Sequence, residues 1–453
     1  MRPMRPVRTT LIASTVTLAL AMSACGDDSP DTTPTTTDAV GAPDTTMDQT
    51  TDTTMAPATT MSPDTTSPDS SPSETTMPMD GMDPTTEDGA SNLRADLTSL
   101  LQEHVYLAGI AIETAVDAGG DMEAPAVQAA VAALDENSVA LAEMIGSVAG
   151  AENQEAFLGL WREHIGFFVD YTLGMAGGDQ AMVDQALTDL DGYQQAAGAF
   201  FEEITGGELV AEDVIAGLDM HVATLTAAID GVVAGDPAAF SDLRTAAQHM
   251  FDAALLLSTG ISAAAPDMFD GDVTSAPAET RAVLTNLLQE HVYLAGIAIE
   301  QAVEVGGDMQ NPTVQAAVAT LDENSVALAE VIGSVAGAEN QEAFLGLWRE
   351  HIGFFVDYTL GMATGDQAMV DQALTDLDGY QQAAGAFFEE ITGGELPADA
   401  VVMSLDEHVA TLTTAIDDLV AGDPAAFTDL RTAGQHMPMA ALAISTAVVA
   451  ATS

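Results

Sequence analysis

Eight histidines recur at matching positions along this 453-residue chain. Imidazole nitrogens bind zinc, copper and iron, so repeated histidines in an apolar setting point first to metal chemistry. The segment LWREHIGFFVDYT, which occurs at 160–172 and again at 347–359, places a histidine within a Trp, Leu and Phe surface. The candidate metal ligands are His104, His164, His221, His249, His291, His351, His408 and His436.

Helical spacing indicates that these imidazoles point inward. Around His164, the residues three or four positions away include Trp161, Phe167 and Phe168, so the imidazole belongs to the apolar stripe of a helix. Glu163, one residue earlier, points about 100° away. The same pattern recurs around the other histidines, with a Glu-His pair in most cases.

A hairpin design positions the histidines. Three stretches, at 100–121, 158–179 and 215–236, each combine apolar residues at helical spacing, one histidine and a closing Gly-Asp turn. Glycine just past a helix adopts the left-handed C-cap conformation, and aspartate caps the next helix. We expect Pro237 in the first turn of such a helix. The stretches therefore predict three helical hairpins, and the Ala, Leu, Gln and Met content favours an all-α fold.

The whole arrangement then repeats with a constant offset of 187 residues, and residues 134–209 and 321–396 are nearly identical. The sequence predicts two tandem six-helix domains, each folding alone. Their expected bounds are 93–266 (copy 1) and 281–453 (copy 2), joined by a linker at 267–280.

The distance of each histidine from its hairpin turn predicts which histidines lie at the same height along the bundle. His221 and His249 are equally far from Gly235, so they should lie at the same height in an antiparallel hairpin. His408 and His436 have the same relation to Gly422, by the same argument.

Carboxylates are predicted at that level too. The mirror positions of the first two histidines of copy 1 fall near Asp135 and Glu136, and near Asp191 and Tyr193. If the hairpins pack in register, each copy contains one polar layer of four histidines and several carboxylates. We expect a metal to be bound by His221 and His249 with help from His104 or His164.

The choice of metal follows from the available ligands. The sequence has no Glu-x-x-His pair of the di-iron type and no His-x-x-x-His, and its one cysteine lies outside the helical copies. A site built mainly from imidazoles suits copper, zinc or iron, and nearby methionines favour copper. These methionines are Met220, Met250, Met403 and Met437. The alternative is structural: buried histidines bonded to Asp, Glu or Tyr, and methionines that fill the core.

The N-terminus predicts export. Three arginines precede the apolar run LIASTVTLALAM, and SAC follows, which is the order of a secretory signal peptide at 1–24. The segment MSAC resembles the lipobox of bacterial lipoproteins, with Met22 in place of the usual Leu. Cys25 would then be the lipidated first mature residue, anchoring an exported protein on the outer side of the cell membrane. The other reading is an incidental unpaired thiol.

Residues 25–92 are rich in Thr, Pro, Asp and Ser and poor in large aliphatic residues, which predicts a disordered tether. Its clustered Met77, Met79 and Met82 could bind Cu(I) through their thioethers, or reflect compositional drift in an unconstrained linker.

Charge and missing motifs narrow the function. Nine Lys+Arg against seventy Asp+Glu give a net charge of −61, which repels nucleic acid and favours cations, metal ions included. The chain lacks a phosphate-binding loop, a Gly-x-Ser-x-Gly nucleophile elbow and a thiol nucleophile, so we predict no catalytic residues. No pattern names a protein partner.

The segments EHVYLAG, LDENS, LWREHIGFFVDYT and QHM together resemble an uncharacterised helical repeat of exported bacterial proteins. Some of those proteins are labelled copper amine oxidase-like because of another, attached domain. The resemblance covers both copies and implies an extracytoplasmic helical module with no established activity. Two functions remain open: a metal-binding envelope lipoprotein, or a ligand-free helical interaction or spacer module.

Overall fold

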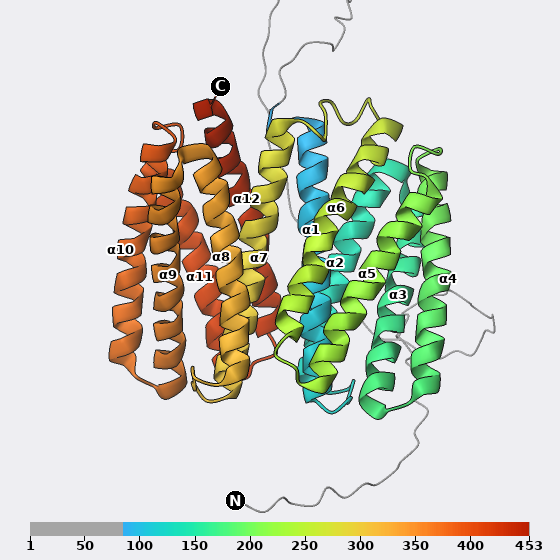
Figure 1. The fold of residues 1–453 in the computed structure, drawn as a ribbon, viewed down its shortest axis with the longest axis horizontal. Coiled ribbons are helices and arrows are strands. Elements are labelled where there is room, and N and C mark those ends of the chain that lie inside the picture. Colours follow the sequence, from blue (N-terminus) through green and yellow to red (C-terminus); the bar gives the residue numbers. More distant parts are fainter. Residues whose placement is uncertain (1–84, 453) are drawn as a thin grey trace, which may run out of the picture. The chain divides into compact units, whose positions relative to one another are not determined.

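The computed structural model describes residues 85–452, which form one compact unit. This part of the chain contains twelve helices and no strand, which confirms the all-α prediction (Figure 1). Six helices belong to copy 1: α1 (Gly89–Asp117), α2 (Pro125–Ala149), α3 (Ala151–Gly177), α4 (Gln180–Ile204), α5 (Ala211–Ala234) and α6 (Ala239–Ala264). Six belong to copy 2: α7 (Ala276–Glu304), α8 (Pro312–Ala336), α9 (Ala338–Thr364), α10 (Gln367–Ile391), α11 (Ala398–Ala421) and α12 (Ala426–Thr452).

The Gly-Asp turns end and restart the helices as their residue types dictate. Gly178 follows α3 with φ 68°, a left-handed conformation that costs glycine little. Asp179 then accepts hydrogen bonds from the backbone N–H groups of Ala181 and Met182 at the start of α4. The turn before α6 differs from the prediction, because Pro237 precedes the helix instead of occupying its first turn.

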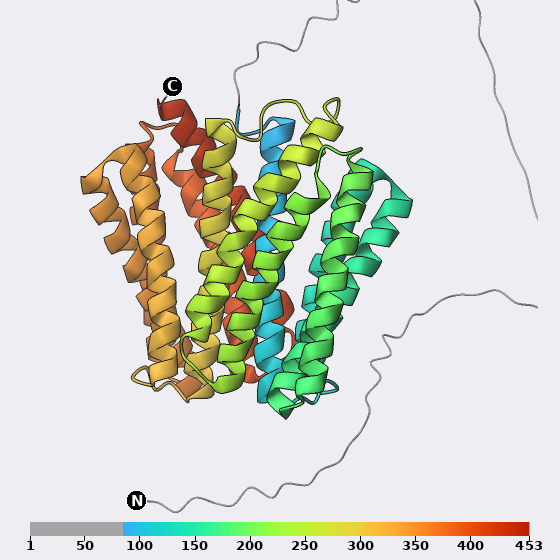
Figure 2. The ribbon, with the colours of Figure 1, turned by 45° about the vertical axis from the view of Figure 1, so that its right-hand side comes forward.

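Each copy is a bundle in which helices adjacent in sequence pack side by side, and the last helix returns to pack on the first (Figures 1 and 2). Within copy 1, α1, α3 and α5 also contact one another. These are the first helices of the three hairpins. The three-fold hairpin repeat therefore brings one equivalent position from each hairpin to the middle of the bundle.

The two copies pack against each other along α1 and α7, the first helix of each copy. Further contacts join α6 to α8 and α12 to α2, so each copy uses equivalent helices towards the other. Both helices at the centre are buried over most of their length. The copies thus share one extended core instead of forming separate bodies, and their independent folding stays a prediction.

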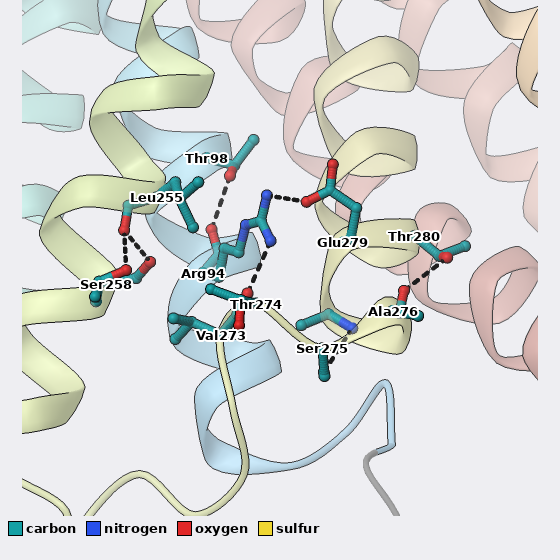
Figure 3. Close-up of polar contacts among 12 residues, drawn as sticks. Arg94, Thr98, Leu255, Ser258, Val273, Thr274, Ser275, Ala276, Glu279 and Thr280 are labelled. Atoms are coloured by element: carbon teal, nitrogen blue, oxygen red, sulfur yellow. Dashed lines mark hydrogen bonds and ion pairs between the residues drawn. The ribbon is translucent and has the colours of Figure 1, made fainter.

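Arg94 at the start of α1 shows how closely the copies are joined (Figure 3). Its side chain is 1% exposed, donates to the Val273 carbonyl at 2.7 Å and pairs with the Glu279 carboxylate of α7. The guanidinium also lies over the Phe251 ring, 5.3 Å from its centroid. These contacts of a buried cation fix the segment between the copies.

Two of the described helices, α5 and α7, are long and apolar enough to cross a membrane by length and composition. In α7, 94% of that apolar window is buried among other helices, which is typical of a core helix. The predicted signal peptide, Cys25 and the methionine cluster of the predicted tether lie outside the described residues.

Candidate metal centre

Three histidines of copy 1 meet at the centre of the bundle. His104 on α1, His164 on α3 and His221 on α5 are 1%, 1% and 4% exposed. Each offers one ring nitrogen, and these three nitrogens lie within 4.8 Å of one another. We call this cluster the copy 1 triad. His291, His351 and His408 form the equivalent copy 2 triad, on α7, α9 and α11.

The spacing inside a triad is close to that of a metal site. The Nε2 atoms of His104 and His164 are 3.3 Å apart, and those of His291 and His351 are also 3.3 Å apart. Nitrogen ligands about 2.0–2.1 Å from a tetrahedral metal lie about 3.3 Å from one another. Two of the three ligands are therefore already at the required separation, and the third needs only a small movement. In a metal-free triad, one Nε2–H donates to the other Nε2.

Burial keeps the triad imidazoles neutral. Loss of solvation lowers the pKa of His104 to about 3 and that of His221 to about 4, with neighbouring histidines adding to each effect. Burial also holds the pKa of His164 well below its usual value, and His104 and His221 lower it further. A neutral imidazole has a free lone pair, which is the form that binds a metal.

Aromatic rings hold the triad in place. The Tyr193 ring stacks on His164 with ring centroids 4.6 Å apart, and the Trp161 ring lies 4.7 Å from that of His104. Phe168 packs edge-on against His221 at 5.7 Å. The Nδ1 atoms of His104 and His221 have no hydrogen-bond partner among the described residues. Packing therefore orients the His221 ring, and packing with the Nε2 contact to His164 orients the His104 ring.

A pocket reaches the copy 2 triad. Its volume is about 70 Å³, enough for one or more water molecules, and all three triad histidines line it. The other lining residues are mostly apolar and come from the helices around the triad, with Met437 of α12 among them. A smaller apolar cavity of about 30 Å³ lies against His291 between α7, α8 and α9. The triad is thus buried but bordered by open space.

The fourth histidine of each copy lies outside the triad. The Nε2 of His249 is 2.9 Å from the Gly217 carbonyl, and that of His436 is 3.0 Å from the Ser404 carbonyl. Each ring donates to the backbone of α5 or α11 one turn before the triad histidine. The prediction that His249 lies level with His221, and His436 with His408, is therefore nearly right. The ring nitrogens are nevertheless used in a structural hydrogen bond, so His221 meets His164 and His104 instead of His249.

The predicted carboxylate layer is not formed around the triad. Asp135 pairs with Arg162 at 2.6 Å, Glu136 pairs with Arg431 of copy 2 at 2.9 Å, and Asp191 is exposed. Of the mirror positions, only Tyr193 reaches a triad histidine. The distance from the turn predicted the height of each residue along its helix, but it could not predict the rotation of the helix about its axis.

The predicted methionines divide into two kinds. Met220 and Met403 are 53% and 72% exposed, so they do not reach the buried triads. Met250 and Met437 are buried, and Met437 lines the pocket beside the copy 2 triad. One thioether thus borders the same pocket as three imidazoles.

A buried polar network that the sequence reading did not identify lies directly behind the triads. Glu103 is 1% exposed and accepts from Tyr293 at 2.9 Å and from Asn137 at 2.8 Å. Arg431 lies 3.4 Å from the same carboxylate. In the Glu103-His104 pair, the histidine therefore faces its own copy, and the glutamate binds Tyr293 and Arg431 of the other copy as well as Asn137 of its own.

The equivalent network surrounds Glu290. This carboxylate accepts from Tyr106 at 3.1 Å, from Asn324 at 2.8 Å and from Arg244 at 3.1 Å. The Tyr106 and Tyr293 rings stack on each other where the two networks meet, 5.5 Å apart. A signal was present in the sequence: residues 105–112 (VYLAGIAI), directly after Glu103 and His104, are apolar at every position or glycine, which is typical of a fully buried helix.

Comparison with known proteins adds no further assignment: neither a family model, nor a curated protein, nor a solved structure matches this chain.

Proposed function

We propose that each copy binds one transition-metal ion through its histidine triad, with copper favoured. The observation that carries the proposal is the convergence of three buried ring nitrogens from three helices. Three histidines with one further position is the ligand set of several zinc and copper sites, and it requires no cysteine or carboxylate.

Energetics also favour a bound ion over an empty triad. Three imidazoles in an apolar core leave polar ring nitrogens without full compensation, which costs free energy. A metal ion would use one lone pair from each ring. Since the unfolded chain has no such arrangement, metal binding would stabilise the folded state.

The preference for copper rests on the softer donor nearby. Met437 lines the pocket against the copy 2 triad, and Met250 occupies the matching position on α6. A thioether is a good ligand for Cu(I) and a poor one for zinc. Zinc or iron would use the imidazoles alone.

The test is metal uptake by the protein without its predicted signal peptide. Metal content is measured after purification, and affinity by titration with Cu(I) under reductant, Cu(II) and Zn(II). We expect two metal ions per chain with affinity tighter than about micromolar, which corresponds to roughly 8 kcal/mol of binding free energy.

Two double variants separate ligands from structural histidines. His221→Ala/His408→Ala removes one triad member from each copy and should abolish tight binding. His249→Ala/His436→Ala removes only the histidines bonded to backbone carbonyls and should leave two sites per chain. Equal uptake by the wild type and the first variant would exclude the triads as the binding site.

We further propose that the protein is an exported lipoprotein of the cell envelope, anchored to the membrane through a lipid on Cys25. The support is the order of basic, apolar and small residues before the chain's one cysteine. Cys25→Ala should release the protein from the membrane fraction. Retention of this variant on membranes after a salt wash would contradict the anchor.

A ligand-free helical spacer is the second candidate function. The continuous core shared by the two copies favours it, because a rigid body on a tether can separate a partner from the membrane. A protein that takes up no metal, yet remains folded, would support this role.

A further inference from the structure

The pocket beside the copy 2 triad opens to solvent. Ala400 on α11 and Ala443 on α12 line it and are exposed, whereas the triad histidines at its inner end are buried. Between them the walls are apolar, with Phe388 and Ile444 among the lining residues. The path thus runs from the surface between α11 and α12 to the ring nitrogens.

The residues at the mouth differ between the copies. With the 187-residue offset, Asp213 stands where copy 2 has Ala400, and Leu256 stands where it has Ala443. Leu256 packs against the core of copy 1. Copy 2 therefore has the smaller side chains at the entrance to its triad.

The inner end of the pocket defines what can enter. All three triad histidines border the pocket, so a metal held by them without the Met437 thioether would have one coordination position facing this space. Its volume of about 70 Å³ and its apolar walls suit a small uncharged molecule and disfavour a hydrated anion.

We propose that the copy 2 centre is an open metal site, whose free position binds a small neutral ligand such as carbon monoxide, dioxygen or nitric oxide. The ligand reaches the metal through the pocket between α11 and α12. This inference rests on the proposed metal binding and adds the class of ligand and its route of entry.

The experiment uses carbon monoxide as the probe on Cu(I)-loaded protein without oxygen. A His221→Ala background removes the copy 1 site, so the signal comes from copy 2 alone. Copper content is measured first, and then the infrared band of bound CO and its rate of formation. We expect one CO per bound copper ion.

Ala443→Leu, which installs the copy 1 residue at the mouth, should leave the copper content unchanged. It should slow CO association by roughly tenfold, because a leucine must be displaced for entry. Ala450→Leu on the exposed side of the same helix is the matched control and should not change the rate. In a His408→Ala background, Leu256→Ala should speed CO binding to the copy 1 site.

The outcomes separate the two proposals. Protein that holds no copper fails the proposed function, and the open site fails with it. Copper without a CO band overturns only the open site. A CO rate that is equal in the Ala443→Leu and Ala450→Leu variants overturns the route through the pocket.

Discussion

The triad histidines lie close together, which imidazolium ions would resist by charge repulsion. Burial lowers the pKa of each ring, so the rings stay neutral and this repulsion is absent. The ordinary histidine pKa of about 6.5 suggests that metal binding weakens below that pH. The lowered values instead predict that the folded protein keeps its affinity to a lower pH.

The same shifts predict acid sensitivity of the metal-free fold. A histidine with a lowered pKa binds a proton in the unfolded chain before it does so in the folded one. Stability is therefore complete above pH 6.5 and falls as the pH drops towards the folded values of about 4 for His221 and about 3 for His104.

Chemical denaturation at pH 7.5, 6 and 5 measures this loss, which we expect to approach about 1.4 kcal/mol per pH unit for each histidine. His221→Gln, which keeps a polar side chain that does not titrate, should reduce the slope. An unchanged slope in that variant would mean that other groups cause the acid sensitivity.

Buried carboxylates between the copies predict the opposite trend, a loss of folding stability as the pH rises. Burial, together with the nearby Glu113, Glu304 and Asp117 carboxylates, raises the pKa of Glu300 to about 8. The pKa of Glu113 is itself raised to about 7, and burial is again the main cause. These groups hold protons in the folded state that the unfolded chain has released, so stability falls as the pH rises from about 4.5 to 8.

Glu300→Gln removes the charge at the most strongly shifted position. We expect the variant to be more stable than the wild type at pH 8 and nearly equal to it at pH 5. Thermal melts at both values test the claim. Glu279→Gln is unsuitable as a control because that carboxylate pairs with Arg94, whereas the exposed Glu155→Gln is suitable.

At the scale of elements, the sequence carried nearly all the necessary signals. The apolar periodicity and the Gly-Asp turns predicted the hairpins, and Gly178 and Asp179 lie where their residue types require. The inward direction of His164 followed from the stripe that contains Trp161. What periodicity could not supply was helix rotation, which decides that His221 meets the triad while His249 meets a backbone carbonyl.

The capping role of Asp179 can be measured directly. Asp179→Ala removes an acceptor for two backbone N–H groups of α4 and should destabilise the protein by about 1 kcal/mol. Asp366→Ala should have the same effect at the start of α10, where the contacts are equivalent. Asp191→Ala, at an exposed position within α4, should have little effect in the same urea titration.

At the scale of the molecule, the sequence identified the duplication but could not show that the copies share a core. That result depends on residues such as Glu103 and Tyr106, whose partners lie in the other copy and far away in sequence. The sequence could not show that Glu103 binds the other copy while His104 faces its own, because this depends on the packing of α1 on α7.

The shared core predicts how an isolated copy behaves. In a fragment of residues 85–266, Tyr106 and Arg244 lose their partners, Glu103 keeps only Asn137, and the face of α1 is exposed. Because the partners in copy 2 are the equivalent residues, a second fragment supplies the same contacts. We expect the fragment to fold as a helical dimer, measured by sedimentation, and Arg244→Ala to weaken that dimer. A stable monomer with a cooperative melt would instead show that each copy is autonomous.

One hydrogen bond between the copies has no equivalent at the corresponding residues. Gln102 donates to Asn286 at 2.6 Å, but the equivalent Gln289 is buried with no hydrogen-bond partner among the described residues, because Ser99 stands where copy 2 has Asn286. In a dimer of identical copies, one substitution would alter both sides of this interface at once. Because the two copies are joined in one chain, a substitution alters one side alone. Ser99 and Asn286 are such a one-sided difference, so the two halves of this chain can carry different residues for different tasks.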